Sequence, residues 1–309
     1  MRDALTRSLL FFGGKGGVGK TTCAAASALE AARRGRHVLV ASVDPAHSVA
    51  DVFGVSVGPT PTPIVEGVTA LEIDPAAEAS RYLNEARAHV SHLFSASVVR
   101  QAFRQFELAS QAPGLEDVAV FDRVMRLVLD PPSGCDLLIV DTAPTGHALR
   151  LLAMPEALAD WLHALAARRR EMVEDNEATR DNPDADPVLA SLQARGARVR
   201  AFHQRLTDAS AAGFVMVLTP ERLPIEETKR AVDALELMGV AIPGVVINRV
   251  LPAAVDGEYH AARVRQQRVY LDEIDARFAA YPRLVLPQLE SDVHGLPALE
   301  RIRMLLFHG

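Results

Sequence analysis

The 309-residue chain contains few cysteines, few lysines and few aromatic residues. Its two cysteines, Cys23 and Cys135, exclude a disulfide framework, a four-cysteine zinc site and a self-contained iron–sulfur site. We therefore expect neither zinc nor an iron–sulfur cluster, and we interpret both thiols as buried small apolar groups. Such scarce use of cysteine favours a reduced, cytoplasmic location.

Long apolar runs and an excess of positive charge are also missing. The run from Leu9 to Phe12 is too short for a signal-peptide core or a membrane span of about 20 residues. The mature protein is therefore expected to begin at or near Met1. With 39 acidic against 33 basic residues and a net charge of -6, nucleic acid is not an expected partner.

What the chain does contain is a recurring alternation of strand-like and helical segments. The strand-like segments are short and nearly continuous in apolar residues, as in parallel sheets that helices cover on both faces. The pattern predicts an α/β fold with a doubly wound, mostly parallel sheet of about seven or eight strands. The expected strands are Ser8–Phe12, His37–Ser42, Thr69–Ile73, Asp136–Asp141, Phe214–Thr219, Val245–Asn248 and Arg283–Leu286.

Two helical stretches, at about 76–130 and 155–212, interrupt this alternation. We interpret them as a helical subdomain inserted into a single domain that covers residues 1–309. One apolar stripe is interpreted as ordinary core packing, and the acidic segment 171–186 as a solvated loop. The stripe consists of Val118, Phe121, Val124, Met125 and Val128.

A glycine-rich segment follows the first expected strand and precedes an alanine-rich helical run. Residues 14–21 fit the pattern G-x-x-x-x-G-K-[ST], whose glycines let backbone N–H groups wrap around a polyphosphate. Lys20 is expected to reach the β- and γ-phosphates of ATP, and the hydroxyl of Thr21 to bind Mg²⁺ directly. The expected nucleotide-binding residues of this P-loop are Gly14, Lys15, Gly16, Gly17, Val18, Gly19, Lys20, Thr21 and Thr22.

Two carboxylates follow expected strands and so face the ligand crevice of an open α/β sheet. Asp44 is expected to orient and deprotonate the attacking water. Asp141 ends an apolar strand, the usual Walker B arrangement, in which the carboxylate binds Mg²⁺ through a water. Residues 142–147 are expected to sense the γ-phosphate, with His147 either a hinge hydrogen-bonding group or a catalyst. The candidate switch residues are Asp44, Pro45, His47, Asp141, Thr142, Gly146 and His147.

Three segments together resemble the ArsA family, which includes the arsenite-pump ATPase and the ATPase that delivers tail-anchored membrane proteins. Their sequences are GKGGVGKTT, DPAHSVADVF and LLIVDTAPTGHALRLLAMPE. The segments at 106–127, 246–251 and 286–299 are similar to later family motifs, so the resemblance covers nearly the whole chain. The first segment, with its early lysine, also marks the deviant P-loop class of MinD, ParA, NifH and ArsA.

The resemblance implies several roles. Lys15 would cross a two-fold interface to the phosphates of the partner subunit, which makes the enzyme a homodimer whose catalytic residues are Asp44, Lys15 and Lys20. Asn248 would contact adenine, and Pro287 would pack near the base. The helical subdomain would open and close with nucleotide and bind a hydrophobic protein client.

Two alternatives stay open: an ArsA-like ATPase subunit of an arsenite or anion efflux pump, partnered with a membrane transporter, and a MinD/ParA-like nucleotide switch. Against the pump, the helical stretches contain no cysteine to bind metalloid.

The stretch 257–267 lacks the CxxC that bridges zinc in tail-anchor targeting relatives. The tail at 299–307 is faintly amphipathic, and packing against the sheet competes with membrane targeting as its explanation. A client groove would use Phe103, Phe106, Phe121 and Met125.

Overall fold

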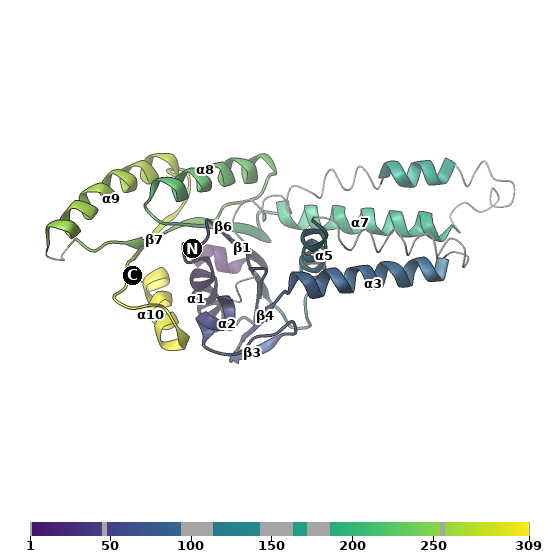
Figure 1. Cartoon of the computed structure of the whole chain (residues 1–309), viewed down its shortest axis with the longest axis horizontal. Helices are drawn as coiled ribbons and strands as arrows, with labels where there is room; N and C mark the ends of the chain where they lie inside the picture. Colours follow the sequence, from purple (N-terminus) through teal and green to yellow (C-terminus); the bar gives the residue numbers. More distant parts are fainter. Residues whose placement is uncertain are drawn as a thin grey trace. The chain divides into compact units, whose positions relative to one another are not determined.

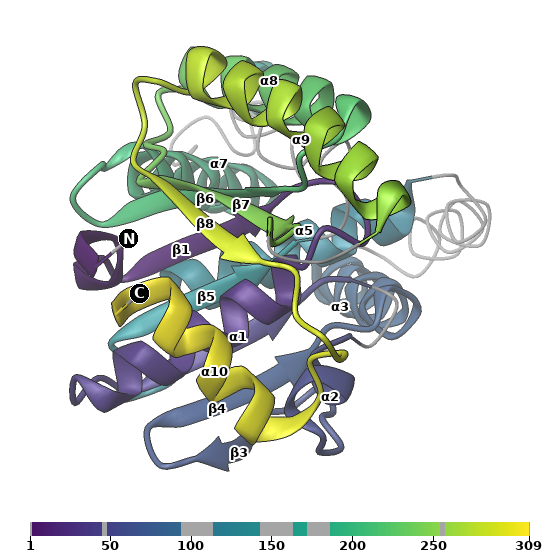
Figure 2. The ribbon, with the colours of Figure 1, turned by 90° about the vertical axis from the view of Figure 1, so that its left-hand side faces the viewer.

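Short apolar segments pair into one eight-stranded sheet in the computed structural model, which describes residues 2–44, 48–93, 114–142, 163–171, 186–253 and 257–308. The strand order is β3-β4-β2-β5-β1-β6-β7-β8, and every pair is parallel except β3 with β4 (Figure 2). The doubly wound, mostly parallel sheet is therefore confirmed. The strands are β1 (Leu9–Gly13), β2 (Val38–Ser42), β3 (Thr62–Val65), β4 (Val68–Glu72), β5 (Leu137–Asp141), β6 (Ala212–Leu218), β7 (Gly244–Val250) and β8 (Arg283–Pro287).

The edge strand β3 is missing from the strands expected from the sequence. It is short, antiparallel to β4, and contains Pro63, whose ring nitrogen cannot donate to a ladder. The connection to β4 is a two-residue turn in which Gly67 adopts φ +77. An edge position needs only one ladder of hydrogen bonds, so Pro63 is tolerated there.

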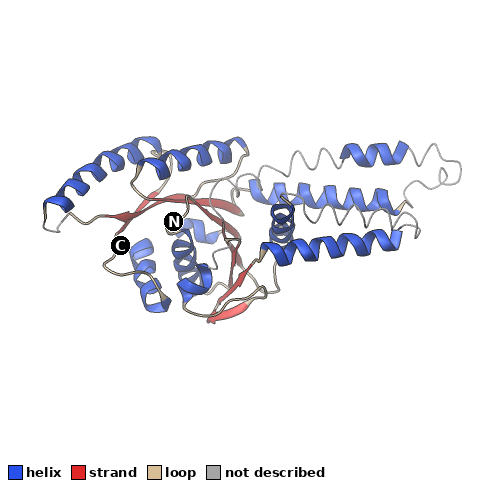
Figure 3. Ribbon diagram, in the orientation of Figure 1, coloured by secondary structure: helices blue, strands red, loops and turns tan. Residues whose placement is uncertain are grey.

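Helices cover both faces of the sheet (Figures 1 and 3). On one face α1 (Lys20–Arg33), α2 (Ser48–Phe53) and α10 (Gly295–His308) pack together. On the other, α8 (Arg222–Leu237) lies against β6 and also contacts α9 (Glu258–Arg277). A short 3₁₀ helix (Arg2–Thr6) precedes β1.

The C-terminal helix α10 is part of the core. Leu299, Ile302, Leu306 and Phe307 are buried, and α10 packs along α1. Its Arg303 forms a buried ion pair with a glutamate of α1. The membrane-targeting interpretation of this tail is therefore wrong, because the apolar face that it required is already covered by protein.

The chain divides into two compact units. The sheet and the helices named above belong to the first. The second comprises Asp74–Asp130 and Arg150–Arg205 and contains α3 (Pro75–Leu93), α5 (Leu115–Leu129) and most of α7 (Pro187–Thr207), together with a helix at 163–171.

Within this helical unit, α5 buries Phe121, Val124, Met125 and Val128 of the predicted apolar stripe and leaves Val118 half-buried. Phe121 packs edge-to-face on Phe202 of α7, with ring centroids 5.4 Å apart, and Met125 is 7% exposed. Core packing is confirmed for these side chains, which therefore do not line an open groove. The other two groove candidates, Phe103 and Phe106, lie outside the described residues.

Most of the acidic segment that was interpreted as a solvated loop, residues 172–185, lies outside the described residues, but Asp186 at its end makes defined contacts. Asp186 accepts a hydrogen bond of 2.7 Å from the backbone N–H of Leu189 at the start of α7 and pairs with Arg169 at 2.8 Å. It therefore caps the helix. In the part of the chain that the structure describes, we find no helix both long and apolar enough to cross a membrane.

Candidate functional site

The candidate site residues lie at the C-terminal ends of the strands. The chain winds away from β1 in both directions, so the sheet has its topological switch point there, the place where open α/β sheets bind ligands. β1 leads into the P-loop, and β2 is followed by Asp44. β5 ends at Asp141, and Asn248 lies near the end of β7. The sequence motifs are thereby brought to one edge.

Three glycines of the P-loop adopt positive φ angles: +153 at Gly14, +78 at Gly17 and +95 at Gly19. A Cβ atom on Gly14 would lie 2.0 Å from the carbonyl oxygen of Val217 in β6. One on Gly19 would lie 2.3 Å from Nδ2 of Asn248. The loop therefore lies against the ends of two strands, where only glycine fits.

The helix α1 begins at Lys20, and Gly19 before it supplies no side-chain cap. The first N–H groups of α1 therefore open onto the P-loop, which is the arrangement that binds anions. Val18 is buried and Thr22 is half-buried, while Gly16 and Gly17 are exposed. In the predicted P-loop, the glycine turn is therefore exposed, and the first residues of the helix that follows it are buried.

The two lysines of the loop have different partners. Lys20 is only 4% exposed, and its Nζ donates a hydrogen bond to the main-chain oxygen of Lys15 at 3.4 Å. The Nζ of Lys15 lies 3.4 Å from Oε1 of Glu227 in α8. One ammonium group is therefore held within the loop, and the other is held by a neighbouring helix.

Asp141 is fully buried at the end of β5. Its Oδ2 accepts a hydrogen bond of 2.7 Å from the hydroxyl of Thr21 and a weaker one of 3.5 Å from Ser42. Its Oδ1 is buried and has no hydrogen-bond partner among the described residues. A carboxylate with one spare acceptor beside a threonine hydroxyl fits a Mg²⁺ ion and its bound water.

Burial raises the pKa of Asp141 from 3.8 to about 6. The hydrogen bond from Thr21 and the charge of Lys20 oppose this shift, whereas the negative charge of Asp44 adds to it. The two acidic residues of the site are therefore close enough to repel each other, which favours a cation between them.

The structure places three further predicted residues. Asp44 is half-buried, and its backbone N–H donates to the hydroxyl of Ser42 at 3.2 Å. The hydroxyl of Thr142 donates to the main-chain oxygen of Phe12 at 2.8 Å, which ties the end of β5 to β1. Pro287 ends β8 and is half-buried. The candidates Pro45, His47, Gly146 and His147 lie outside the described residues.

Asn248 links the end of β7 to the P-loop. Its Nδ2 donates to the main-chain oxygen of Val18 at 2.8 Å, and its Oδ1 accepts from the N–H of Arg249 at 2.9 Å. Arg249 has a positive φ of 60 and lies at an irregularity between β7 and β8. It lines a cavity of about 360 Å³ together with Gln288, which follows Pro287.

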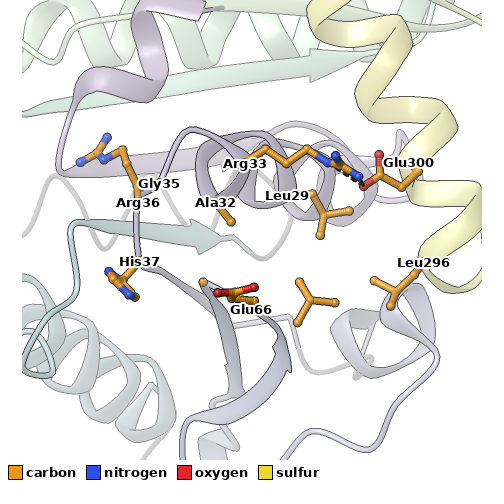
Figure 4. Close-up of a pocket in the computed structure, with 11 residues that line it drawn as sticks. Leu29, Ala32, Arg33, Gly35, Arg36, His37, Glu66, Leu296 and Glu300 are labelled. Atoms are coloured by element: carbon orange, nitrogen blue, oxygen red, sulfur yellow. Dashed lines mark hydrogen bonds and ion pairs between the residues drawn. The ribbon is translucent and has the colours of Figure 1, made fainter.

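A second cavity, of about 540 Å³, lies at the other end of α1 (Figure 4). Leu29 and Arg33 of α1, Glu66 of the β3–β4 turn and Glu300 of α10 line it, and Arg33 pairs with Glu300 at 2.8 Å. Since α1 is 14 residues long, this cavity is about 20 Å from the P-loop. It lies at the N-terminal ends of the strands and takes no part in the candidate site.

The two cysteines differ. Cys23 is fully buried in α1, and burial raises the pKa of its thiol to about 12, as expected of an inert apolar group. Cys135 is only half-buried before β5, so the expectation of burial is wrong for it. Among the described residues, no cluster of three or more His, Cys, Asp and Glu side chains could hold a metal ion.

Two contacts of the site have no sequence signal. Ser42, inside β2, reaches Asp141, and Glu227, far along the chain in α8, reaches Lys15. Ser42 meets Asp141 because the parallel register of β2 with β5 places the two residues side by side, and the sequence does not state that register. Glu227 depends on how α8 packs, which periodicity alone does not fix.

Comparison with known proteins agrees with this geometry. Residues 7–308 match the ArsA ATPase family, described as anion-transporting ATPases. A relative from Aquifex aeolicus, named as an arsenical pump-driving ATPase, is 34% identical over 96% of this chain and 98% of its own length. An ATPase ASNA1 homolog of Trypanosoma cruzi is 31% identical over 99% of this chain and 93% of its own length. ATPase GET3 of Eremothecium gossypii is 29% identical over 98% of this chain and 90% of its own length.

The family match and these relatives span nearly the whole chain, so they include the P-loop, Asp44 and Asp141. The chain therefore belongs to the ArsA ATPase family, and it is an ATP-hydrolysing enzyme.

Proposed function

We propose that the chain hydrolyses ATP as a homodimer in which each subunit supplies Lys15 to the site of its partner. The observation that carries this proposal is the divergence of the two lysines. Lys20 bonds to the main chain of its own loop, whereas the Lys15 ammonium is held by α8. A side chain that is not committed to its own loop is the one expected to act across an interface.

Within each site, the roles follow from the contacts. The loop N–H groups and Lys20 bind the β- and γ-phosphates, while Thr21 and Asp141 hold Mg²⁺, directly and through water. When bound, the ion neutralises charge that develops on the phosphates. Asp44 orients the attacking water and accepts its proton. Asn248 and Pro287 lie beside the base, with the 360 Å³ cavity next to them.

Complementation between two inactive variants tests the homodimer. Lys15→Ala and Asp44→Asn are each expected to be inactive alone, while Lys229→Ala keeps wild-type turnover, because Lys229 pairs with Asp233 on the exposed side of α8. If Lys15 acts in the partner, a mixed dimer has one complete site: the Asp44 of one subunit with the Lys15 of the other. Random mixing then restores about a quarter of wild-type turnover.

Action of Lys15 within its own subunit gives the opposite result. In that case each site of a mixed dimer lacks either Lys15 or Asp44, so mixing restores nothing. Full turnover by Lys15→Ala alone would also contradict the proposal. Nucleotide binding by each variant, measured separately, shows that the loop is intact.

For the biological role, we propose that the helical unit moves with the nucleotide state and binds a hydrophobic protein client. Family membership supports this proposal. The surface of the helical unit adds no support, because the exposed large hydrophobic side chains of the described residues all lie in the other unit. Asp44→Asn loaded with ATP should retain the client in a pull-down, and single-span membrane proteins are the expected catch. If the pull-down recovers a membrane transporter and no single-span membrane proteins, the result would favour the pump.

The pump remains the second candidate because a relative is named as an arsenical pump-driving ATPase. Arsenite or antimonite added to the purified enzyme tests it directly. A rise in ATP turnover would support the pump reading. With one cysteine buried in α1 and the other before β5, we expect no stimulation.

A further inference from the structure

The ion pair between Lys15 and Glu227 joins the P-loop to helix α8. Its two charged atoms are 3.4 Å apart, and each side chain is about one-third exposed, at 33% and 32%. Both residues belong to the same compact unit. The contact is therefore within reach of solvent and of an incoming anion.

The fold explains why Glu227 lies there. α8 follows β6, which pairs with β1 in parallel, with Gly13 beside Met216. The start of α8 is thereby brought to the same edge as the P-loop. Pro224, Thr228 and Ala231 are buried, so Glu227 lies at the border of the buried face, from which its carboxylate reaches the loop.

The neighbouring carboxylate behaves differently. Glu226, one position earlier in α8, pairs with Arg277 of α9 at 2.8 Å. Its exposure is similar to that of Glu227, at 41%. The two adjacent glutamates therefore have distinct tasks: one joins two helices, and the other contacts the phosphate loop.

We infer that Glu227 is a positioning residue that holds the Lys15 ammonium in the nucleotide-free subunit and releases it when Lys15 engages a phosphate. The inference rests on the proposed homodimer. Glu227 is then an anionic competitor of the triphosphate for the same ammonium, and it keeps Lys15 extended from the loop until the partner's nucleotide replaces it.

The size of this competition can be bounded. A partly exposed ion pair of this kind shifts an equilibrium by a factor of about 5 at most. The contact is weak enough to be exchanged and strong enough to set where the side chain rests. Its removal should make Lys15 easier to recruit, so that ATP-dependent dimers form at lower concentration.

The first experiment measures dimer formation in the presence of ATP and Mg²⁺, in an Asp44→Asn background that blocks turnover. Sedimentation velocity gives the midpoint concentration for the parent, for Glu227→Gln and for the control Glu226→Gln. Because each dimer releases two such pairs, Glu227→Gln is expected to lower the midpoint by about two- to 25-fold, and by less at high salt. Glu227→Asp keeps the carboxylate and should return the midpoint towards the parent value.

The second experiment needs no dimer. The chain has only three lysines, so limited acetylation followed by peptide mass spectrometry reports on each of them. In the nucleotide-free protein, Glu227→Gln should increase the labelling of Lys15 severalfold relative to Lys229. Glu226→Gln should leave that ratio unchanged.

The outcomes separate the two proposals. A parent protein that dimerises with ATP, while Glu227→Gln shows an unchanged or higher midpoint and unchanged Lys15 labelling, overturns the inference alone. Damage to α8 would raise the midpoint, so it cannot imitate the expected result. A parent that stays monomeric with ATP overturns the homodimer and, with it, the role of Glu227.

Discussion

Thr21 donates a 2.7 Å hydrogen bond to Oδ2 of Asp141 and so joins the first turn of α1 to the end of β5. The other carboxylate oxygen has no partner among the described residues. The site thus contains a buried charge that the protein alone satisfies only in part. This arrangement costs stability without ligand and provides an acceptor for a metal-bound water.

Asp141→Asn is expected to stabilise the nucleotide-free protein while abolishing ATP turnover. The pKa of Asp141 is about 6 in the folded chain against 3.8 as its ordinary value, so the folded state binds more protons between these limits. The free energy of unfolding therefore falls as pH rises from about 4 to about 6, by up to about 3 kcal/mol. An asparagine side chain does not ionise, so the variant does not lose this stability as pH rises.

Urea unfolding of both proteins at about pH 4 and about pH 8, without Mg²⁺, checks this prediction. The variant should match the wild type at the lower pH and exceed it at the higher. An advantage that is the same at both values would show that packing, not the buried charge, causes the difference.

Gly19→Ala is expected to destabilise the P-loop and prevent nucleotide binding. Its φ of +95 costs an alanine about 1–2 kcal/mol, and the new Cβ collides with the Asn248 amide. Gly17→Ala is the matched control, since its φ is also positive but open space surrounds it. Titration with a fluorescent ATP analogue should show a much larger loss at Gly19.

The double variant Gly19→Ala/Asn248→Ala separates the two causes. It removes the collision but keeps the backbone strain, and it also lacks the hydrogen bond from Asn248 to Val18. The reference is therefore Asn248→Ala alone: in that background Gly19→Ala should cost no more stability than Gly17→Ala costs in the wild type. No recovery would mean that the contact with Asn248 is not what requires glycine at position 19.

Arg303→Met should destabilise the protein by about 3–5 kcal/mol, because it leaves Glu30 buried without its main partner. Burial alone would raise the pKa of Glu30, but hydrogen bonds from Arg303, Arg34 and His308 outweigh it and lower the pKa. The pair therefore stabilises the fold above the ordinary glutamate range and loses that contribution as pH falls through the lowered pKa.

Thermal unfolding of the wild type and Arg303→Met across this acidic range gives the test. The difference between them should shrink as Glu30 becomes protonated. The double variant Glu30→Leu/Arg303→Met, which leaves no carboxylate buried, should recover part of the loss at neutral pH. A double variant less stable than the single one would contradict the assignment.

Phe121→Ala should cost the helical unit about 3–5 kcal/mol, since it empties the contact with Phe202. Helix loss by circular dichroism is expected at lower denaturant than loss of bound ATP analogue, because the two belong to separate compact units. Leu223→Ala, at a position 61% exposed, should change little. A similarly small effect at Phe121 would reopen its role in a groove.

The sequence by itself was enough to predict the parts of the molecule whose information is local. The P-loop is a contiguous pattern that follows a strand and precedes a helix. Central strands such as β5 are recognisable from their uninterrupted apolar residues. Covering helices on both faces leave a parallel strand no polar face, so composition alone reveals it.

Contacts between distant segments were decided only by the tertiary structure. The edge strand β3 forms despite Pro63 because β4 offers it a partner, and the apolar stripe of α10 meets α1 instead of a membrane. Ser42 reaches Asp141, and Glu227 reaches Lys15, through the register of strands and the packing of α8. These depend on which surfaces meet, and no local pattern encodes that.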